Sequence, residues 1–500
     1  ARKAPPIIQF LLQMTCPHFA RLRHNYSKGN IPKQIQMFVR KYLHWHRQSC
    51  ICTHIRTIFA QCAIQNIIRG VFKKMKLSQF ANVVKADGFY LLHNTLYQTA
   101  ISVSGEEAAF IDSISDYHSF EPDMNSNFHE ALIEQGMLVE ENVREHQLVG
   151  YYEKNSRPIY LKLILIVTRQ CNFRCPYCYE EHECKTMRDE IYDAIIVFIK
   201  KQLEMKKYDG LHISFFGGEP TLEHDAIVKF SKKLLTTLPE KVPYSASMTT
   251  NGYLLTPDRF RELVDCKITS YQITVDGTED NHNKTRVVAN GRGSWSRIIE
   301  NLKAARDSEL DFAVSIRTNF TPESVSLADD FYSYISEEFG GDNRFSVHYE
   351  CAKNLGGERV HKMGLCEDQG EQIVLLAKIA RKYSLQDKAT IDMISSFGGL
   401  SCYAGTDNSL VIDFDGTLRK CTVSIDSDRN IVGKLYESGN YQLYPSNFSN
   451  WTCYRLQDEC LHCEILPLCL GKKCPQSYYN LHSCNEIKKI YQAHIVRKFE

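Results

Sequence analysis

The first 86 residues of the chain contain no aspartate or glutamate, although they contain fifteen lysines and arginines. The remaining residues hold 45 basic and 59 acidic side chains, so the nearly neutral total conceals two unlike parts. An arginine-rich segment without acids is typical of a targeting sequence or of an arm that binds nucleic acid. We favour a different interpretation of this basic extension, residues 1–75, in which Ala1 to Lys74 are not native coding sequence and translation starts at Met75.

Long hydrophobic runs and a secretory signal are also missing. No stretch of eighteen or more apolar residues occurs, which excludes an ordinary membrane-spanning helix. Without a secretory signal, the nineteen cysteines are not expected to form the disulfide framework of a small secreted protein. We expect a cytoplasmic protein of two or three domains in which closely spaced cysteines bind metal.

Residues 76–150 are predicted to form a small α/β domain. Two strands are expected around a His-Asn turn within Phe89–Val103, and Ser104 has the position of an N-cap before a helix. A second helix is expected over Phe128–Gln135. Residues 145–158 are polar, end in Arg-Pro, and are predicted to be a linker.

Strands and helices alternate through residues 159–390, which indicates a parallel sheet. Six strands are expected, over Leu161–Val167, Leu211–Phe216, Ser245–Thr250, Tyr271–Val275, Ala313–Asn319 and Phe345–Tyr349. Three of the intervening helices are expected over Asp189–Lys206, His224–Thr237 and Ser296–Ser308. Six such units predict an α/β fold with a partial (β/α)6, TIM-like barrel, whose ligand site lies at the C-terminal ends of the strands.

Residues 400–490 differ from the barrel, because they combine eight cysteines with short turns and few expected regular elements. This segment has too little apolar mass to fold by packing alone. We therefore expect bound metal to organise it.

Three cysteines with the spacing CxxxCxxC, Cys171, Cys175 and Cys178, directly follow the first predicted strand. Three thiolates leave one iron of a four-iron cluster open for a chelating molecule. The alternative is a zinc site with a distant fourth ligand, which fits this spacing and position poorly. The second predicted strand ends in a Gly-Gly-Glu-Pro motif that begins at Gly217.

The segment CNFRCPYCY, with Tyr177 before the last cysteine, resembles the signature of the radical S-adenosylmethionine superfamily. The resemblance implies that Cys171, Cys175 and Cys178 hold a [4Fe–4S] cluster. In this family the cluster gives one electron to S-adenosylmethionine, which yields methionine and a 5′-deoxyadenosyl radical that abstracts hydrogen. The protein binds and orients the reactants and excludes water, while the cofactor supplies the chemistry.

Three later motifs extend the resemblance, and one of them, Thr249-Thr250-Asn251-Gly252, resembles the family's segment that lines the cofactor. The Gly-Gly-Glu-Pro motif would bind the methionine amino group, because glycines permit close backbone approach and a carboxylate pairs with an ammonium. Arg286 lies in a stretch like the family's DG…HDxxR and would meet the methionine carboxylate, although Asn283 replaces the family's aspartate. A surface structural role is the alternative for Arg286. The cofactor-binding residues implied are Tyr177, Gly217, Gly218, Glu219, Pro220, Asn251 and Arg286.

The C-terminal cysteines resemble the SPASM domain, which binds two auxiliary [4Fe–4S] clusters in radical enzymes that modify peptides and proteins. By the family's order, one set of ligands is Cys402, Cys421 and Cys474, and the other is Cys460, Cys463, Cys469 and Cys484. One extra residue precedes Cys474. Cys453 is either a fourth ligand of the first set or a free thiol, and zinc is the alternative metal for the whole segment.

Residues 76–150 resemble the winged-helix-like element that binds the leader of a precursor peptide as an added strand. A plain structural domain is the alternative. The resemblance therefore implies a maturase of ribosomally made peptides, with S-adenosylmethionine, three [4Fe–4S] clusters, and an electron donor such as flavodoxin or ferredoxin. Neither nucleic acid nor membrane is an expected partner.

We expect a thioether crosslink between a cysteine sulfur and an acceptor carbon, with the open iron of the first auxiliary cluster holding the thiolate; carbon–carbon and other crosslinks are alternatives. The main competing function is anaerobic sulfatase maturation, which oxidises cysteine or serine to formylglycine. Enzymes of that kind usually lack the leader-binding domain and carry an aspartate immediately after the second SPASM cysteine. Here that position is Thr422.

Overall fold

The computed structural model describes residues 74–499, apart from 86–87, 116–118, 124–125, 156–158, 206–207, 356–364, 366–368, 454–455, 473 and 476–482. The predicted basic extension lies outside the described residues except for its last two positions. The chain divides into two compact units: Ala1–Lys76 with Tyr117–Asn142, and Leu77–Asp116 with Val143–Glu500. The proposed boundaries of the N-terminal recognition domain, 76–150, therefore stay a prediction.

In the first unit, Met75 of β1 (Met75–Leu77) and Phe120 exchange two backbone hydrogen bonds of 2.8 Å. The predicted second helix is confirmed as α6 (Asn127–Glu134), and the Ser126 side chain caps it by accepting from the backbone of His129. Strand β5 (Leu138–Glu140) follows.

The second unit begins with a three-stranded antiparallel sheet of β2 (Ala81–Lys85), β3 (Tyr90–Asn94) and β4 (Thr99–Val103). The prediction of a His-Asn turn is wrong by two residues, because both residues end β3 and the turn follows them. The Asn94 side chain accepts from the backbone of Leu96 and Tyr97, which stabilises that turn. Ser104 caps α5 (Gly105–Ser113) in a capping box with Glu107, as the sequence predicts.

The predicted linker over residues 145–158 is wrong, because Glu145–Asn155 form helix α7. Val149 and Tyr152 are buried one helical turn apart, which gives the segment an apolar stripe that its polar composition obscures. Glu145 accepts hydrogen bonds from the Ser78 hydroxyl at 2.6 Å and from the Gln79 backbone at 2.9 Å. These buried contacts hold the start of the helix.

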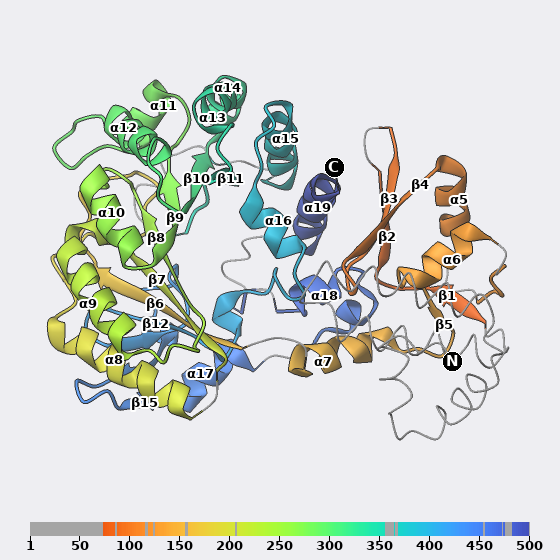
Figure 1. Cartoon of the computed structure of the whole chain (residues 1–500), viewed down its shortest axis with the longest axis horizontal. Coiled ribbons are helices and arrows are strands. Elements are labelled where there is room, and N and C mark those ends of the chain that lie inside the picture. Colours follow the sequence, from red (N-terminus) through yellow and green to blue (C-terminus); the bar gives the residue numbers. More distant parts are fainter. Residues whose placement is uncertain are drawn as a thin grey trace, which may run out of the picture. The chain divides into compact units, whose positions relative to one another are not determined.

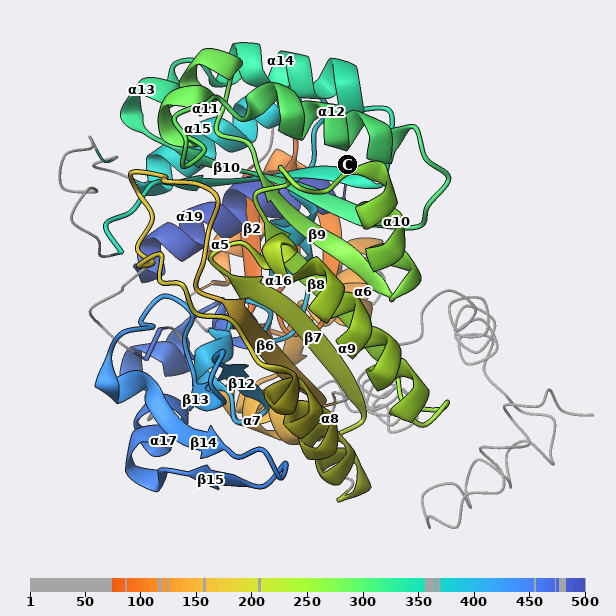
Figure 2. The same ribbon diagram turned by 90° about the vertical axis from the view of Figure 1, so that its left-hand side faces the viewer.

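All six predicted barrel strands are confirmed, each within a few residues of its expected bounds. They lie side by side in parallel, in the order β11-β10-β9-β8-β7-β6 (Figures 1 and 2). The strands are β6 (Tyr160–Thr168), β7 (Gly210–Gly217), β8 (Tyr244–Thr250), β9 (Ile268–Thr274), β10 (Ala313–Phe320) and β11 (Phe345–Cys351).

Helices follow the strands and cover one face of this sheet, as Figure 2 shows for α8, α9 and α10. The three predicted helices are confirmed as α8 (Asp189–Glu204), α9 (His224–Thr237) and α12 (Trp295–Arg306). The remaining helices of this part are α10 (Pro257–Asp265), α11 (Glu279–Thr285), α13 (Pro322–Val325), α14 (Ala328–Phe339), α15 (Gln369–Lys382) and α16 (Lys388–Ile394).

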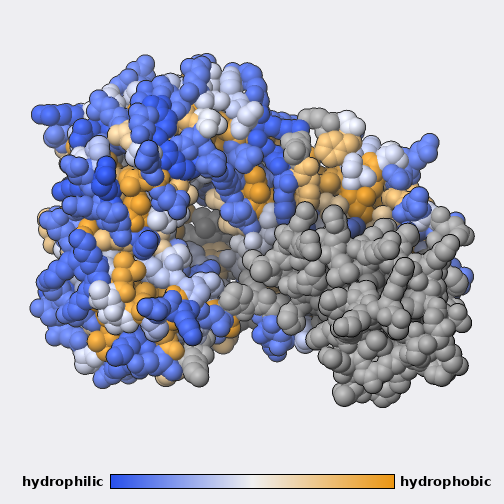
Figure 3. All heavy atoms as spheres, viewed as in Figure 1, coloured by the Kyte–Doolittle hydropathy of each residue, from blue (hydrophilic) through white to orange (hydrophobic). Residues whose placement is uncertain are grey.

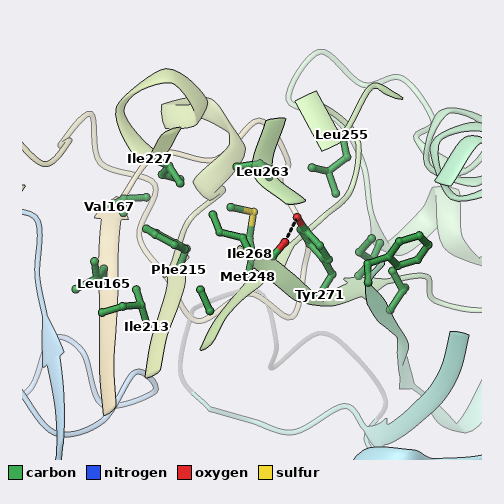
Figure 4. Close-up of a cluster of buried hydrophobic side chains, with 14 of the residues drawn as sticks. Leu165, Val167, Ile213, Phe215, Ile227, Met248, Leu255, Leu263, Ile268 and Tyr271 are labelled. Carbon is green, nitrogen blue, oxygen red and sulfur yellow. Dashed lines mark hydrogen bonds between the residues drawn. The ribbon is translucent and has the colours of Figure 1, made fainter. Parts of the chain in front are cut away.

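The core lies between the sheet and these helices. Alternate strand residues such as Leu165, Phe215 and Met248 point toward Ile227 of α9 and Leu263 of α10 (Figure 4). The other face of the strands is polar and only partly buried. It carries side chains such as His212, Ser247, Gln272, Arg317 and His348.

The C-terminal segment has more regular structure than the sequence predicts. Its strands are β12 (Ser409–Ile412), β13 (Thr417–Arg419), β14 (Ile431–Leu435) and β15 (Tyr441–Leu443), and its helices are α17 (Pro445–Thr452), α18 (Leu466–Cys469) and α19 (Cys484–Ile495). Strand β12 pairs in parallel with β6, so the barrel sheet continues to ten strands. Because Ile412, Leu418 and Val432 add to the barrel core, this segment does not depend on metal alone.

In the part of the chain that the structure describes, we find no helix with the length and apolar character needed to cross a membrane. On the barrel side of the molecule, hydrophilic residues cover most of the face seen in Figure 3, and hydrophobic residues appear there in small patches.

Candidate active site

The three signature cysteines lie in the loop that follows β6. Cys171, Cys175 and Cys178 are partly buried, and burial raises the pKa of each thiol, that of Cys178 to about 12. The negative charges of the neighbouring thiolates add to the increase, and the Cys178 backbone N–H donates to the Cys175 carbonyl at 3.2 Å, so these two cysteines lie in one turn. Thiolates collected in this way need a cationic partner, and an iron cluster supplies one.

No three or more His, Cys, Asp or Glu side chains of the described residues are arranged to hold a single metal ion. A [4Fe–4S] cluster distributes its cysteine ligands over several irons and does not need such convergence. Cys171 also accepts a hydrogen bond from the backbone N–H of Phe173 at 3.4 Å, a contact typical of cluster-binding sulfur.

Two glycines allow the end of β7 to lie directly against the start of the cysteine loop. Gly217 has a φ of +135°, and a Cβ added there would lie 2.2 Å from the Thr168 carbonyl oxygen. A Cβ on Gly218 would lie 2.1 Å from the Gln170 carbonyl oxygen. Any other residue would push the two loops apart, so this close backbone approach is one reason for the glycine pair.

Glu219 is buried and accepts four hydrogen bonds from the protein. Its donors are the Thr221 backbone at 2.9 Å, the Thr221 hydroxyl at 2.5 Å, the Thr250 hydroxyl at 2.6 Å and the Asn251 backbone at 2.7 Å. The carboxylate thereby holds together the C-terminal ends of β7 and β8. The following Pro220 begins a short 3-10 turn, Pro220–Glu223. The predicted contact of Glu219 with an ammonium stays a prediction.

Asn251 connects the end of β8 to the cysteine loop. Its Nδ2 donates to Asn172 Oδ1 at 2.7 Å, while its Oδ1 accepts from the Tyr253 backbone at 3.0 Å. Asn172 lies directly after Cys171 in the sequence. The structure therefore brings the predicted residues Cys171, Glu219 and Asn251 into one connected set.

Arg286 is buried, so the alternative that it is a surface residue is wrong. Its guanidinium lies 5.5 Å from the centre of the Phe173 ring, and one Nη donates to the Tyr177 hydroxyl at 2.8 Å. Tyr177 in turn donates to Asp276, a residue to which the sequence analysis gave no role of its own. Among the described residues, the buried Nε of Arg286 has no hydrogen-bond partner, which leaves a donor for a carboxylate ligand.

A chain of hydrogen bonds holds the backbone at Arg286. Asp276 N–H donates to His282 Nδ1 at 3.1 Å, and His282 Nε2 contacts the Ser294 hydroxyl at 2.9 Å, which donates to the Arg286 carbonyl at 2.6 Å. Burial, followed by the charge of Arg286, lowers the pKa of His282 well below its usual range, so the ring is neutral. A neutral ring fits its acceptor and donor roles.

Asn283 occupies the position at which the family pattern has aspartate. Its Oδ1 accepts from the backbone of Ser294 at 2.9 Å and of Trp295 at 3.1 Å, at the start of α12. An amide oxygen and a carboxylate oxygen both serve as acceptors here. The substitution therefore leaves the support of the Arg286 loop intact.

Neighbouring thiols affect the pKa of two C-terminal cysteines. Burial raises the pKa of Cys402 to about 11, and the charges of Cys474 and Cys421 add to the increase. Burial raises the pKa of Cys469 to about 12, with contributions from Cys463, Cys460 and Cys484. The two ligand sets that the resemblance implies stay a prediction. Cys453 is exposed at the end of α17.

Asn430 holds the Cys421 loop and has no signal in the sequence. It is fully buried, and its Oδ1 accepts from the backbone of Lys420 and Cys421, each at 2.9 Å. Its Nδ2 donates to the carbonyls of Cys421 at 2.7 Å and of Ser424 at 2.9 Å. Thr422 follows Cys421 and makes two contacts with the Tyr403 hydroxyl. Its backbone N–H donates to that hydroxyl at 2.9 Å, and its Oγ1 also lies 2.9 Å from it.

A buried ion network joins the end of β6 to the β12–β13 hairpin. Arg169, two residues before Cys171, contacts both carboxylate oxygens of Asp413, at 2.6 and 3.3 Å, and Asp426 at 3.0 Å. Arg419 also donates to Asp413, at 2.9 Å. The network therefore links the signature loop to the segment that carries Cys421.

Residues 165–328 match the family model of the Radical SAM superfamily. The cysteine-type anaerobic sulfatase-maturating enzyme of Clostridium novyi is 23% identical over 330 residues, which cover 61% of this chain and 86% of that protein. The radical SAM cyclopropyl synthase TigE of Paramaledivibacter caminithermalis is 23% identical over 443 residues, which cover 80% of this chain and 89% of that protein.

Among solved structures, native anSMEcpe with bound AdoMet and the Cp18Cys peptide is similar with a TM-score of 0.52 and 17% identity. The match covers 69% of this chain and 98% of that chain, and it shows a shared fold. The family match includes the cysteine loop, the Gly-Gly-Glu-Pro motif and Arg286. Within the matched residues, the chain carries a radical SAM domain.

Proposed function

We propose that this enzyme modifies a ribosomally made precursor peptide and that it forms a thioether between a cysteine sulfur and a carbon of an acceptor residue. The observation that carries the proposal is the presence, in the same compact unit as the radical SAM domain, of two further groups of cysteines. Additional clusters at these groups, one of them with three cysteines, suit a reaction that must bind a substrate thiol and remove an electron.

The residues at the strand ends fit bound S-adenosylmethionine. Cys171, Cys175 and Cys178 would hold a cluster that supplies one electron for the reductive cleavage of S-adenosylmethionine to methionine and a 5′-deoxyadenosyl radical. Arg286, with its unpaired buried Nε, would hold the methionine carboxylate, and Glu219 would orient the amino group. An external one-electron donor, such as flavodoxin or ferredoxin, would start the reaction.

The proposed reaction balances without an added oxidant. The acceptor carbon gives one hydrogen atom to the deoxyadenosyl group, the thiol gives one proton, and the carbon and sulfur join. The electron released when the new bond forms equals the electron used to cleave S-adenosylmethionine. The products are methionine, 5′-deoxyadenosine, the thioether and one proton.

Relatives support a peptide substrate without specifying the bond. The name of the sulfatase-maturating relative indicates protein modification, and anSMEcpe was solved with a bound peptide. Sulfatase maturation is accordingly the second candidate function. Thr422, which contacts the Tyr403 hydroxyl, stands where such enzymes carry an aspartate, and this favours the crosslinking function.

Anaerobic reconstitution with iron counting tests the cluster proposal. Three [4Fe–4S] clusters predict about twelve irons per chain, whereas about four would leave the C-terminal cysteines without iron. Replacing Cys171, Cys175 and Cys178 together by alanine should abolish 5′-deoxyadenosine formation, measured by mass spectrometry. Cys184→Ala is the matched control, because Cys184 is exposed and outside the predicted ligand sets. Continued formation in the triple variant would refute the cluster assignment.

The proposed substrate class is tested by incubating the reconstituted enzyme with peptides that are encoded beside its gene. A thioether lowers the peptide mass by two hydrogen atoms and blocks one thiol from alkylation. Formylglycine would instead remove the sulfur and introduce an aldehyde. A small cysteine-rich peptide converted in the first way supports the proposal, while conversion of a sulfatase peptide to the aldehyde would replace it with the second candidate.

A further inference from the structure

Strand β10 presents a polar face with features that cluster and cofactor binding do not explain. Its residues alternate: Val314, Ile316 and Phe320 are buried in the core, whereas Ser315, Arg317 and Asn319 are only partly buried on the other face. This second face belongs to the partly open polar side of the barrel sheet. A side chain there can reach a molecule bound inside the barrel.

Arg317 is connected to the cysteine loop through one intervening side chain. Its Nε donates to Asn319 Oδ1 at 3.2 Å, and Asn319 Nδ2 contacts the Tyr177 hydroxyl at 3.4 Å. Tyr177 is also the acceptor for Arg286. Arg317 therefore lies one layer below the proposed S-adenosylmethionine site, about 7 Å along the strand from Asn319.

The guanidinium of Arg317 has no carboxylate partner among the described residues. The nearby acids already have cationic partners: Asp387 lies 3.0 Å from the ring of His348, and Glu350 lies 3.0 Å from Lys353 Nζ. His348 lies directly opposite Arg317 in the β10–β11 register. Asp387 is paired with His348 and Glu350 with Lys353, so both acids already balance other cations.

A second group on the same face is also unsatisfied. The Ser315 hydroxyl is buried and has no hydrogen-bond partner in the part of the chain that the structure describes, and it is two residues from Arg317 on the strand. A partly buried cation without a counter-ion and a buried hydroxyl without a partner both cost free energy. A ligand with an anionic oxygen group would supply the missing counter-ion of Arg317.

We propose that Arg317 binds a carboxylate of the substrate, the side chain of an aspartate or glutamate close to the residue from which hydrogen is abstracted. The peptide nature of this ligand rests on the proposed function. A guanidinium is suited to the task because it binds a carboxylate through two parallel N–H groups, which fixes the orientation of the bound chain as well as its charge. Arg317 is then a specificity-determining residue of the barrel.

S-adenosylmethionine is another source of a carboxylate in the same barrel. Arg286 already has an unpartnered, buried Nε beside the cysteine loop, whereas Arg317 lies one layer further in. The geometry therefore points to Arg286 for the cofactor and to Arg317 for the substrate. The experiment has to separate these two sources.

Site-resolved labelling of arginines tests the proposal with the reconstituted wild-type enzyme. Phenylglyoxal would be applied anaerobically, and the labelling rate of each arginine would be measured by peptide mass spectrometry. The probes are acetyl-Ala-Glu-Ala-amide and its matched glutamine analogue, each with and without S-adenosylmethionine. Arg306, which is ion-paired to Glu338, is the internal control.

We expect the glutamyl tripeptide to slow labelling of Arg317 several-fold, the glutamine analogue to have no effect, and neither to change Arg306. Equal labelling of Arg317 with both tripeptides would overturn the proposal. Full protection by S-adenosylmethionine alone would also overturn it, because the carboxylate at Arg317 would then be the cofactor's.

Glutarate, a small dicarboxylate, distinguishes failure of this site from failure of the proposed function. Protection by glutarate without protection by the tripeptide would overturn the peptide assignment, since the barrel would then accept only small carboxylates. If Arg317 binds no carboxylate at all, neither glutarate nor the glutamyl tripeptide will slow its labelling. Once a substrate peptide is known, Arg317→Glu should raise KM for it, and exchanging the peptide acid for lysine should restore binding.

Discussion

The cysteines after β6 and the cysteines of the C-terminal segment are supported in different ways. The first three lie in one short loop, and residues at successive strand ends hold it: Asn251 after β8, Asp276 after β9 and Asn319 on β10. The predicted C-terminal ligand sets draw on thiols up to 72 residues apart, Cys402 and Cys474 among them. A repeating sheet positions the first group, whereas single buried polar residues position the second. Substitutions can therefore separate the two regions.

The largest effect is expected for Glu219→Gln, which acts on the strand-end region. An amide keeps the shape of the side chain but places an NH2 group against backbone and hydroxyl donors that need an acceptor. Hydrogen bonds to a charge contribute about 1.5–3 kcal/mol each, so we expect 5′-deoxyadenosine formation to fall by at least about 100-fold. Glu300→Gln on the exposed face of α12 is the control. Equal rates in both variants would contradict the assigned role.

Asp413→Asn tests the link between the two regions. The substitution leaves Arg169 and Arg419 facing a neutral amide in a buried site, and breaking a buried ion pair costs about 3–5 kcal/mol. We expect a lower midpoint of unfolding together with loss of iron from both regions. The exposed pair of Asp189 with Lys229 provides the control, since Asp189→Asn should leave the midpoint unchanged. Loss of iron from the C-terminal groups alone would show that the network supports only one region.

Asn430→Asp should act on the C-terminal region alone. It keeps the acceptor for Lys420 and Cys421 but removes the two donors to the carbonyls of Cys421 and Ser424, at about 1–3 kcal/mol for each unsatisfied buried group. We expect iron content to fall by about four per chain, with S-adenosylmethionine cleavage retained. If cleavage falls in parallel with iron, the two regions are not separable in this way.

The smallest effect is expected at Asn283. Asn283→Asp restores the family's residue and keeps the acceptor for the backbone of Ser294 and Trp295, so stability and cleavage rate should change little. Asn283→Ala removes that cap, and we expect it to cost about 1 kcal/mol in the free energy of unfolding. Thermal unfolding of the two variants side by side measures the difference. A large loss of activity in Asn283→Asp would mean that the amide donor is needed after all.

The barrel was predictable because its local patterns agree with its long-range structure. Strands buried on the helix-covered face by residues such as Leu165 and Phe215 stand out as apolar segments, and the glycine motif marks the end of one of them. Helix α7 was missed because only two side chains, Val149 and Tyr152, form its buried stripe within a polar segment. The C-terminal strands were missed because they are three to five residues long and are joined to the rest of the sheet only through the pairing of β12 with β6.

The amino-acid sequence by itself determined the ligand types and their spacing: three cysteines after a strand, two glycines before Glu219, and Arg286 after an Asp-Gly pair. Those choices depend on local chemistry, because a cluster needs nearby thiolates and a close backbone approach needs glycine. Only the tertiary structure decided that Arg286 is buried against Tyr177, that Asn430 and Asp413 hold the C-terminal region, and that Arg317 lacks a carboxylate partner among the described residues. Such facts depend on which distant side chains meet, and no spacing along the chain encodes that.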